Sequence, residues 1–201
     1  MYAVFARSRI AVSRGFAVAV LLLIAFTTHS FSQEGLLDIV MEVSGLFLLS
    51  IASLGRLWAL LYISGNKSQT VITEGPYSVV RHPLYVFSFI GAVGIGLASE
   101  NVLVLALILA FYLLYYPMTI RAEEDKLSDR FGPAYIEYMR RVPRFVPKLS
   151  LYREPHLYSV KTAQFVRNFA DAMWFVWIFI LLHFIENLQA SGALPVLWRV
   201  P

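Results

Sequence analysis

Thr73-Glu74-Gly75-Pro76-Tyr77-Ser78-Val79-Val80-Arg81-His82-Pro83-Leu84-Tyr85 is the stretch that decides the fold, and it separates two long apolar segments. Gly75-Pro76 and His82-Pro83 both oppose a continuous helix, because proline lacks a backbone N–H and disfavours helical geometry in the residue before it. The chain is therefore expected to bend twice where the apolar segments end. Irregular backbone at a membrane surface is stable where protein or a water-filled cavity satisfies its polar groups. The stretch is a candidate site, although Arg and Tyr at membrane boundaries also serve as simple anchors.

The composition indicates a multi-pass membrane protein. Of the 201 residues, 58% are hydrophobic and 15% are charged, and the charges cluster between long apolar runs. The chain has no cysteine, which excludes disulfides, thiolate metal ligands and a cysteine nucleophile. The net charge of +4 does not indicate a nucleic-acid partner, because Lys and Arg gather in the cytoplasmic loops of membrane proteins. No metal site is expected either, since no His-x-x-x-His pair or ladder of acids is present.

Five apolar segments predict an all-α protein with about five membrane-spanning helices in a single domain, residues 1–201. The segments run approximately over Phe16–Phe31, Asp38–Ile63, Pro83–Ala98, Val102–Met118 and Phe169–Leu188. The first is expected to be retained as a helix, because its end lacks a convincing signal-peptide cleavage site. The connection Ser99-Glu100-Asn101 is so short that the segments on either side of it must form a helical hairpin.

The distribution of Lys and Arg predicts the orientation of these segments. Five spans place residues 1–14, 64–81 and 119–165, which hold nearly all the basic side chains, on one side of the membrane. Basic loops favour the cytoplasm, so we expect a cytoplasmic N-terminus and a C-terminus on the opposite side. Membrane lipids are then the protein's immediate partners, and the sequence does not indicate an oligomeric state.

A second candidate site follows the fourth apolar segment, where Arg121–Asp125 places acids close to the bilayer. Glu123 precedes Leu127 by four residues, so it lies on the apolar face of its helix, and Glu124 lies near that face. A carboxylate on an apolar face needs a partner such as a cationic group. The alternative interpretation is a solvated helix end. Gly132-Pro133 is expected to end this helix and begin another, which lies on the membrane surface or caps the site.

Read together, the two stretches resemble the isoprenylcysteine carboxyl methyltransferase family and the related membrane phospholipid methyltransferases. The resemblance rests on the order and spacing of four motifs: Val71-Ile72-Thr73-Glu74-Gly75-Pro76-Tyr77, Arg81-His82-Pro83-Leu84-Tyr85, Glu123-Glu124, and Phe131-Gly132-x-x-Tyr135-x-x-Tyr138. It covers about residues 67–147, less than half of the chain. The apolar segment at 169–188 departs from the simplest members of the family.

The resemblance implies an integral membrane enzyme that uses S-adenosylmethionine at the cytoplasmic face. Its acceptor would be lipid-like or isoprenoid-like, would enter from the bilayer, and would be methylated on oxygen or nitrogen. Glu123 or Glu124 would bind the ammonium group of the cofactor. The other residues implied to hold the cofactor are Gln69, Thr70, Val71, Ile72, Tyr77, His82, Pro83, Leu84 and Tyr85.

The resemblance also implies that Arg81 or Arg121 orients an anionic acceptor through paired hydrogen bonds. Carboxyl methyltransferases of the family have an Arg four residues before the first matching Glu. This chain has Thr119 at that position, and Arg121 stands two residues before Glu123. The departure puts a carboxylate acceptor in question.

Two other functions are compatible with the sequence. Membrane sterol-type reductases, which use NADPH, also have an acidic patch after a span and an aromatic-rich helix that ends on Val-Pro, here Val142-Pro143-Arg144-Phe145. A non-catalytic membrane subunit that keeps the scaffold is the third reading. Binding assays with the two cofactors separate the reductase from the methyltransferase, and a scaffold would bind neither.

Overall fold

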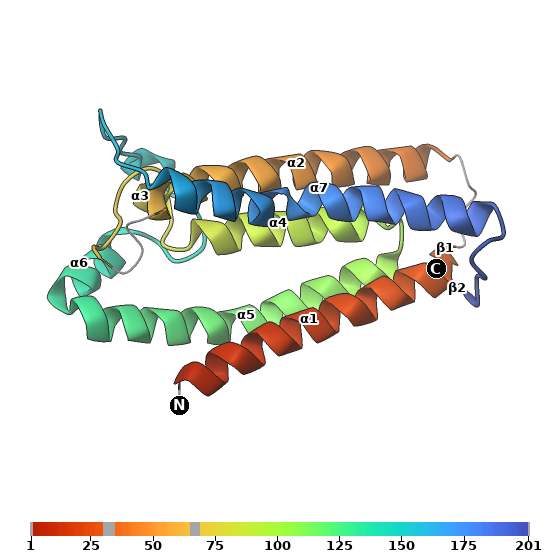
Figure 1. The fold of residues 1–201 in the computed structure, drawn as a ribbon, viewed down its shortest axis with the longest axis horizontal. Coiled ribbons are helices and arrows are strands. Elements are labelled where there is room, and N and C mark those ends of the chain that lie inside the picture. Colours follow the sequence, from red (N-terminus) through yellow and green to blue (C-terminus); the bar gives the residue numbers. More distant parts are fainter. Residues whose placement is uncertain (1, 30–34, 65–68, 201) are drawn as a thin grey trace.

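The computed structural model describes residues 2–29, 35–64 and 69–200, and within them the protein is a bundle of long helices (Figure 1). The elements in chain order are α1 (Tyr2–Phe26), β1 (Thr27–His29), α2 (Leu36–Ile63), α3 (Pro76–Val79), α4 (Pro83–Ala98), α5 (Val102–Phe131), α6 (Pro133–Arg141), η1 (Leu149–Leu151), α7 (Thr162–Ala190) and β2 (Trp198–Val200). The all-α prediction is confirmed for the bundle.

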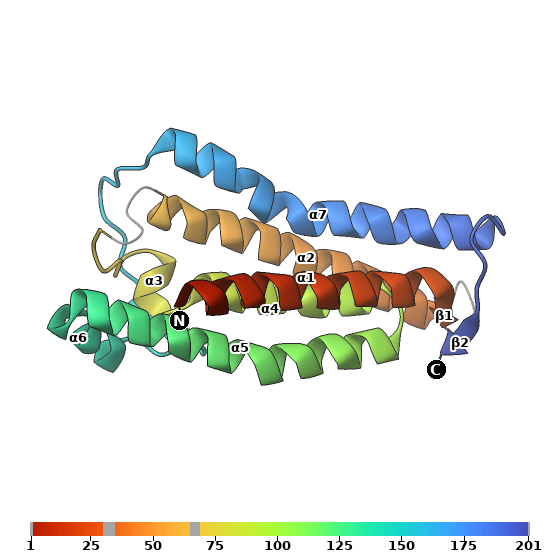
Figure 2. The same cartoon turned by 60° about the horizontal axis from the view of Figure 1, so that its bottom comes forward.

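Three helices of the described chain, α2, α5 and α7, are long and apolar enough to cross a membrane. The protein is therefore a multi-pass membrane protein. The apolar part of α1, Ala11–Phe26, and the helix α4 are shorter, and for them membrane crossing stays a prediction. Figures 1 and 2 show both helices running alongside the three long ones.

The helical hairpin predicted around Ser99-Glu100-Asn101 is present. Helix α4 begins at Pro83, whose missing N–H costs nothing at the first helical position, and it ends at Ala98. Helix α5 begins after Asn101, whose side chain accepts a hydrogen bond of 3.1 Å from the Val104 N–H. The predicted break is also present, because α5 ends at Phe131, Gly132 caps it, and α6 begins at Pro133.

Small residues bring α2 and α4 into close contact. A Cβ atom on Gly45 would lie 2.6 Å from the backbone nitrogen of Ala98, and one on Gly94 would lie 3.0 Å from the Gly45 carbonyl oxygen. The contact at Gly45 requires glycine and the one at Gly94 is tight. Small residues are common where membrane helices pack without a hydrophobic driving force between them. A separate buried cluster joins α1, α5 and α7 through Val20, Ile24, Val104, Ile108, Ile178 and Leu182.

The ends of the first and last helices differ from the sequence prediction. Helix α1 already begins at Tyr2, within the basic residues 1–14 that precede the predicted first span. It ends at Phe26, and Thr27–His29 then pairs in parallel with Trp198–Val200. The rest of the predicted first span lies outside the described residues. Helix α7 begins at Thr162, before the apolar run predicted from 169. The periodicity of apolar residues predicts neither difference. The added turns of α1 and α7 are polar, and the pairing of β1 with β2 joins residues far apart in sequence.

Candidate active site

The loop before α4 is shaped by Gly75, which has φ +57° and opens the short helix α3. A Cβ atom on Gly75 would lie 2.3 Å from the ring of Tyr62, so the close approach as well as the backbone angle requires glycine. The Gly75 N–H donates to the Arg153 carbonyl oxygen at 2.8 Å. The loop is thus held against the end of α2 and against the segment that follows α6.

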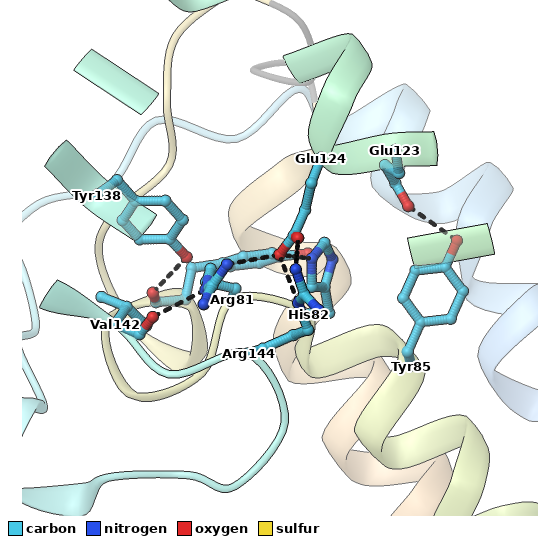
Figure 3. A network of polar contacts seen from close by, with 9 residues as sticks. Arg81, His82, Tyr85, Glu123, Glu124, Tyr138, Val142 and Arg144 are labelled. Atoms are coloured by element: carbon cyan, nitrogen blue, oxygen red, sulfur yellow. Dashed lines mark hydrogen bonds and ion pairs between the residues drawn. The ribbon is translucent and has the colours of Figure 1, made fainter. Parts of the chain in front are cut away.

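Three basic side chains converge on the carboxylate of Glu124, which is buried with 4% of its surface exposed (Figure 3). Its Oε1 accepts from Arg81 Nη1 at 2.7 Å and lies 3.1 Å from His82 Nε2. Arg144 donates to both oxygens, with Nε 3.2 Å from Oε1. The cluster joins the loop before α4, the end of α5 and the segment after α6.

The surroundings of Glu124 hold its carboxyl group in the ionised form. Glu124 lies beyond the apolar run that ends at Met118, outside the part of α5 suited to the bilayer. Burial raises its pKa, but the hydrogen bonds from His82 and Arg144 and the charge of Arg81 outweigh burial and lower the pKa to about 2. With its oxygens taken by these side chains, Glu124 serves as a structural counter-ion.

Glu123 has very different surroundings, although it is the neighbouring residue. Its Oε2 accepts a hydrogen bond of 2.8 Å from the Tyr85 hydroxyl on α4 (Figure 3). Within the described residues no cationic side chain forms an ion pair with it. The half-buried carboxylate therefore retains capacity for a cation.

Glu123 lines a cavity of about 120 Å³ between α4, α5, α6 and the loop before α4. We call this cavity the pocket. Its walls are mainly apolar or aromatic, and its acidic and basic side chains are Glu123, Arg81 and His82. The lining residues are Ile63, Thr70, Val71, Ile72, Tyr77, Arg81, His82, Pro83, Leu84, Tyr85, Glu123, Leu127, Phe131, Tyr135 and Tyr138.

Helix α6 covers one side of the pocket, where Tyr135 and Tyr138 are each 3% exposed. The Tyr138 hydroxyl donates to the Tyr77 carbonyl oxygen at 2.8 Å and so ties α6 to α3. Burial raises the pKa of both tyrosines on α6 and of Tyr77, which keeps their hydroxyl groups neutral donors.

Comparisons with known proteins agree with this geometry. A family model described as phospholipid methyltransferase matches residues 35–134. The nickel-cobalt-cadmium resistance protein NccN of Alcaligenes xylosoxydans is 38% identical over 97% of this chain and 91% of its own length. The cobalt-zinc-cadmium resistance protein CzcN of Cupriavidus metallidurans is 41% identical over 75% of this chain and 69% of its own length. A protein-S-isoprenylcysteine O-methyltransferase of Schizosaccharomyces pombe is 34% identical over 41% of this chain and 35% of its own length. The chain belongs to the phospholipid and isoprenylcysteine methyltransferase family.

No solved structure matches the chain. The resemblance seen in the sequence motifs is confirmed, and the protein is a membrane enzyme of the methyltransferase class. The matched residues 35–134 reach from α2 to the start of α6, so they hold both candidate stretches. Helix α7 and the segment after α6 lie outside this match and within the match to the resistance protein NccN, which covers nearly the whole chain.

In this methyltransferase, most of the residues expected at the cofactor site lie together. Those that line the pocket are Thr70, Val71, Ile72, Tyr77, Arg81, His82, Pro83, Leu84, Tyr85 and Glu123. Gln69, Arg121 and Glu124 do not line it. Gln69 and Arg121 are exposed, while Glu124 points into the ion cluster.

Arg144 is the member of the ion cluster that the sequence prediction missed, and Ile63 and Leu127 are pocket-lining residues to which it gave no role. Arg144 donates to Glu124 from a position twenty residues further along the chain. The signal was the Val142-Pro143-Arg144 sequence directly after the capping helix. The Val142 carbonyl accepts from Arg81 Nε at 2.8 Å, and the Pro143 carbonyl from the Arg81 N–H at 2.9 Å.

Proposed function

We propose that the protein transfers a methyl group from S-adenosylmethionine to a lipophilic acceptor that enters from the bilayer. The observation that carries the proposal is the Glu123 carboxylate, which has a neutral tyrosine partner and lies in an apolar, aromatic pocket. A carboxylate in such surroundings favours a cationic ligand. S-adenosylmethionine carries an ammonium and a sulfonium group, so the residues present fit this cofactor.

In this proposal Glu123 binds the ammonium group, and Tyr85 keeps the carboxylate oriented. Val71, Ile72 and Tyr77 contact the rest of the cofactor. When bound, S-adenosylmethionine supplies an activated methyl group for direct displacement by a nucleophilic atom of the acceptor. The chain itself contributes alignment and the exclusion of water, and no covalent enzyme intermediate is required. Glu124, although expected from sequence as an alternative ligand, acts through Arg81 and His82.

We assign the orientation of a polar acceptor group to Arg81 rather than to Arg121. Arg81 lines the pocket, whereas Arg121 is exposed outside it. Because Glu124 and the Val142 carbonyl already accept from Nη1 and Nε of Arg81, the Nη2 group of the guanidinium remains for an acceptor. This supports an acceptor whose binding rests mainly on apolar contact.

We further propose that the chain is one integral membrane domain with five spans, of which α1 and α4 are the short ones. The pocket would face the cytoplasm, in agreement with the basic residues of 64–81 and 119–165. The acceptor would then reach the pocket from the cytoplasmic leaflet.

Calorimetric titration of the detergent-purified protein with S-adenosylmethionine tests the function. We expect saturable binding, weakened about tenfold or more in Glu123→Gln, since a hydrogen bond between charged groups contributes about 1.5–3 kcal/mol. Glu137→Gln is the matched control, because that side chain is 71% exposed on α6 and does not line the pocket. Failure of well-folded wild-type protein to bind, with binding of NADPH instead, would favour the reductase.

We also propose that the methyl transfer serves tolerance to transition metals, since the relatives named for such resistance match this chain over most of its length. Growth of a sensitive host in nickel, cobalt or cadmium salts tests this. Expression of the wild type is expected to raise tolerance, and expression of Glu123→Gln is not. Equal protection by the wild type and Glu123→Gln would show that tolerance does not depend on methyl transfer. Protection by neither protein would reject a role in metal tolerance.

A further inference from the structure

The segment that joins α6 to α7 presents apolar side chains to its surroundings. Val146 and Leu149 are each 78% exposed, and Leu157 is 93% exposed. Figures 1 and 2 place this segment at the end of the bundle that holds α3 and α6. Large apolar side chains in this number on one short stretch indicate a surface that contacts something apolar.

Hydrogen bonds fix the backbone of this segment. The Lys148 N–H donates to the Val79 carbonyl at 2.9 Å, and the Arg153 N–H donates to the Ser78 hydroxyl at 3.0 Å. The Lys161 N–H donates to the Ser64 carbonyl at 3.3 Å. The apolar side chains therefore do not turn inward unless these bonds break.

Aromatic contacts show at which level of the bundle the segment lies. The ring of Tyr152 is 6.0 Å from that of Trp58, which is 36% exposed near the end of α2. The ring of Tyr158 is 4.7 Å from that of Tyr62, and its hydroxyl donates to the Tyr62 carbonyl. Trp and Tyr gather where the acyl chains of a bilayer meet the headgroups. The segment thus lies beside the last two turns of α2 and has aromatic neighbours typical of a membrane boundary.

The charges of the segment suit an anionic surface. Lys148 and Arg153 are exposed, and neither forms an ion pair with any residue that the structure describes. Glu154 is the acid among residues 144–161. Basic side chains beside exposed apolar ones form a pattern that binds membrane surfaces containing anionic lipids.

We propose that residues 144–161 are an interfacial anchor. Val146, Leu149 and Leu157 insert at the boundary of acyl chains and headgroups, and Lys148 and Arg153 bind the phosphates of anionic lipids. The partner is the lipid leaflet at the end of the bundle that holds the pocket. This inference does not depend on the identity of the cofactor.

The anchor is continuous with the ion cluster, because it begins at Arg144, which binds Glu124. Contact with the leaflet therefore stabilises the position of Arg144 and of the preceding Val142 carbonyl, which binds Arg81. A change in lipid headgroups is therefore expected to change the position of Arg81 in the pocket, through Arg144 and the Val142 carbonyl.

The absence of native cysteine makes a direct test practical. A nitroxide label at Leu157→Cys is placed in lipid nanodiscs, and its accessibility to oxygen and to a water-soluble nickel chelate is compared. Glu137→Cys is the control, because that side chain is 71% exposed and carries charge. We expect the label at 157 to favour oxygen and the label at 137 to favour nickel. Nickel preference at both positions, in protein that unfolds normally on heating, would overturn the anchor.

The lipid preference has its own test in nanodiscs of phosphatidylcholine with or without phosphatidylglycerol. Anionic lipid is expected to raise the oxygen preference of the label at 157, and Lys148→Gln with Arg153→Gln is expected to abolish that rise. Lys126→Gln with Arg140→Gln is the matched control, since it removes equal charge from exposed positions outside the segment. The anchor would be contradicted if anionic lipid did not raise the oxygen preference of the label in the parent protein. It would also be contradicted if the two pairs of substitutions abolished that rise equally.

Discussion

Glu123 and Glu124 show how neighbouring residues acquire different roles. Successive residues on an α-helix point about 100° apart. Glu124 therefore meets Arg81, His82 and Arg144, while Glu123 meets the Tyr85 hydroxyl and the pocket. A buried carboxylate stabilises the basic side chains around it, and removing its charge leaves the charges of those side chains uncompensated.

Glu124→Gln is expected to destabilise the protein by about 3–5 kcal/mol, because it leaves three basic side chains around a neutral group. Thermal unfolding in detergent measures the effect as a lower midpoint. Glu137→Gln is the control, since it disturbs an exposed pair with Arg141 at 4.0 Å and is expected to change stability by about 0.5 kcal/mol or less. Similar midpoints for Glu124→Gln and the parent would contradict the assigned role.

The same residue predicts a pH dependence. The pKa of Glu124 is lowered from 4.5 to about 2, so its ionised form stabilises the folded state. This contribution is complete above pH 4.5 and is lost as the pH falls towards 2. Unfolding midpoints across this range are expected to fall less steeply in Glu124→Gln than in the parent. Parallel curves would show that other groups dominate acid unfolding.

At the scale of elements, the contact between α2 and α4 decides where the pocket residues on α4 stand. The helices approach closely at Gly45, where a Cβ atom would be 2.6 Å from the Ala98 backbone nitrogen. Backbone does not yield as a side chain does, so an added methyl group forces the helices apart. Tyr85 and Pro83 on α4 then shift relative to Ile63 on α2.

Gly45→Ala is therefore expected to destabilise the protein by about 1–3 kcal/mol, as overpacking does in other interiors. Gly15→Ala is the matched control, because no atom lies within 4 Å of a Cβ atom built there. In α1 this change is expected to be neutral or stabilising by up to about 1 kcal/mol, since alanine favours helix over glycine. Equal unfolding midpoints for the two variants would contradict the close contact.

At the scale of the whole molecule, α3 and α6 beside the pocket lie at one end of the bundle. Strands β1 and β2 pair at the other end (Figure 1). Helix α1 starts towards the first end, and β2 closes the chain at the second. Gln189 on α7 holds the second end together, since its side-chain nitrogen donates to the Ile24 and Ala25 carbonyls. The fold is compatible with an odd number of spans.

Labelling single cysteines with a membrane-impermeant maleimide tests the five-span topology. Asp129→Cys lies on α5 at the pocket end, and Ser191→Cys follows α7; both positions are exposed. In intact cells Ser191→Cys is expected to react and Asp129→Cys is not, whereas both react once the membrane is permeabilised. Reaction of both in intact cells would contradict the predicted orientation.

The sequence by itself determined the features that depend on near neighbours. Proline and glycine gave correct boundaries at Pro83 and Gly132-Pro133, and the short connection at Glu100 required the hairpin. Apolar runs identified the bundle helices, because hydration and backbone hydrogen bonding act on each segment alone. The order and spacing of four short motifs also identified the family, because each motif depends on near neighbours in the chain.

Only the tertiary structure decided which glutamate faces the pocket, because apolar periodicity is compatible with either and the rotation of α5 depends on its packing against α4. It also brought Arg144 to Glu124 and paired Thr27–His29 with Trp198–Val200. Such pairs depend on where distant backbones cross. Local sequence preferences act over about one helical turn, so they carry no information about which distant segments lie side by side.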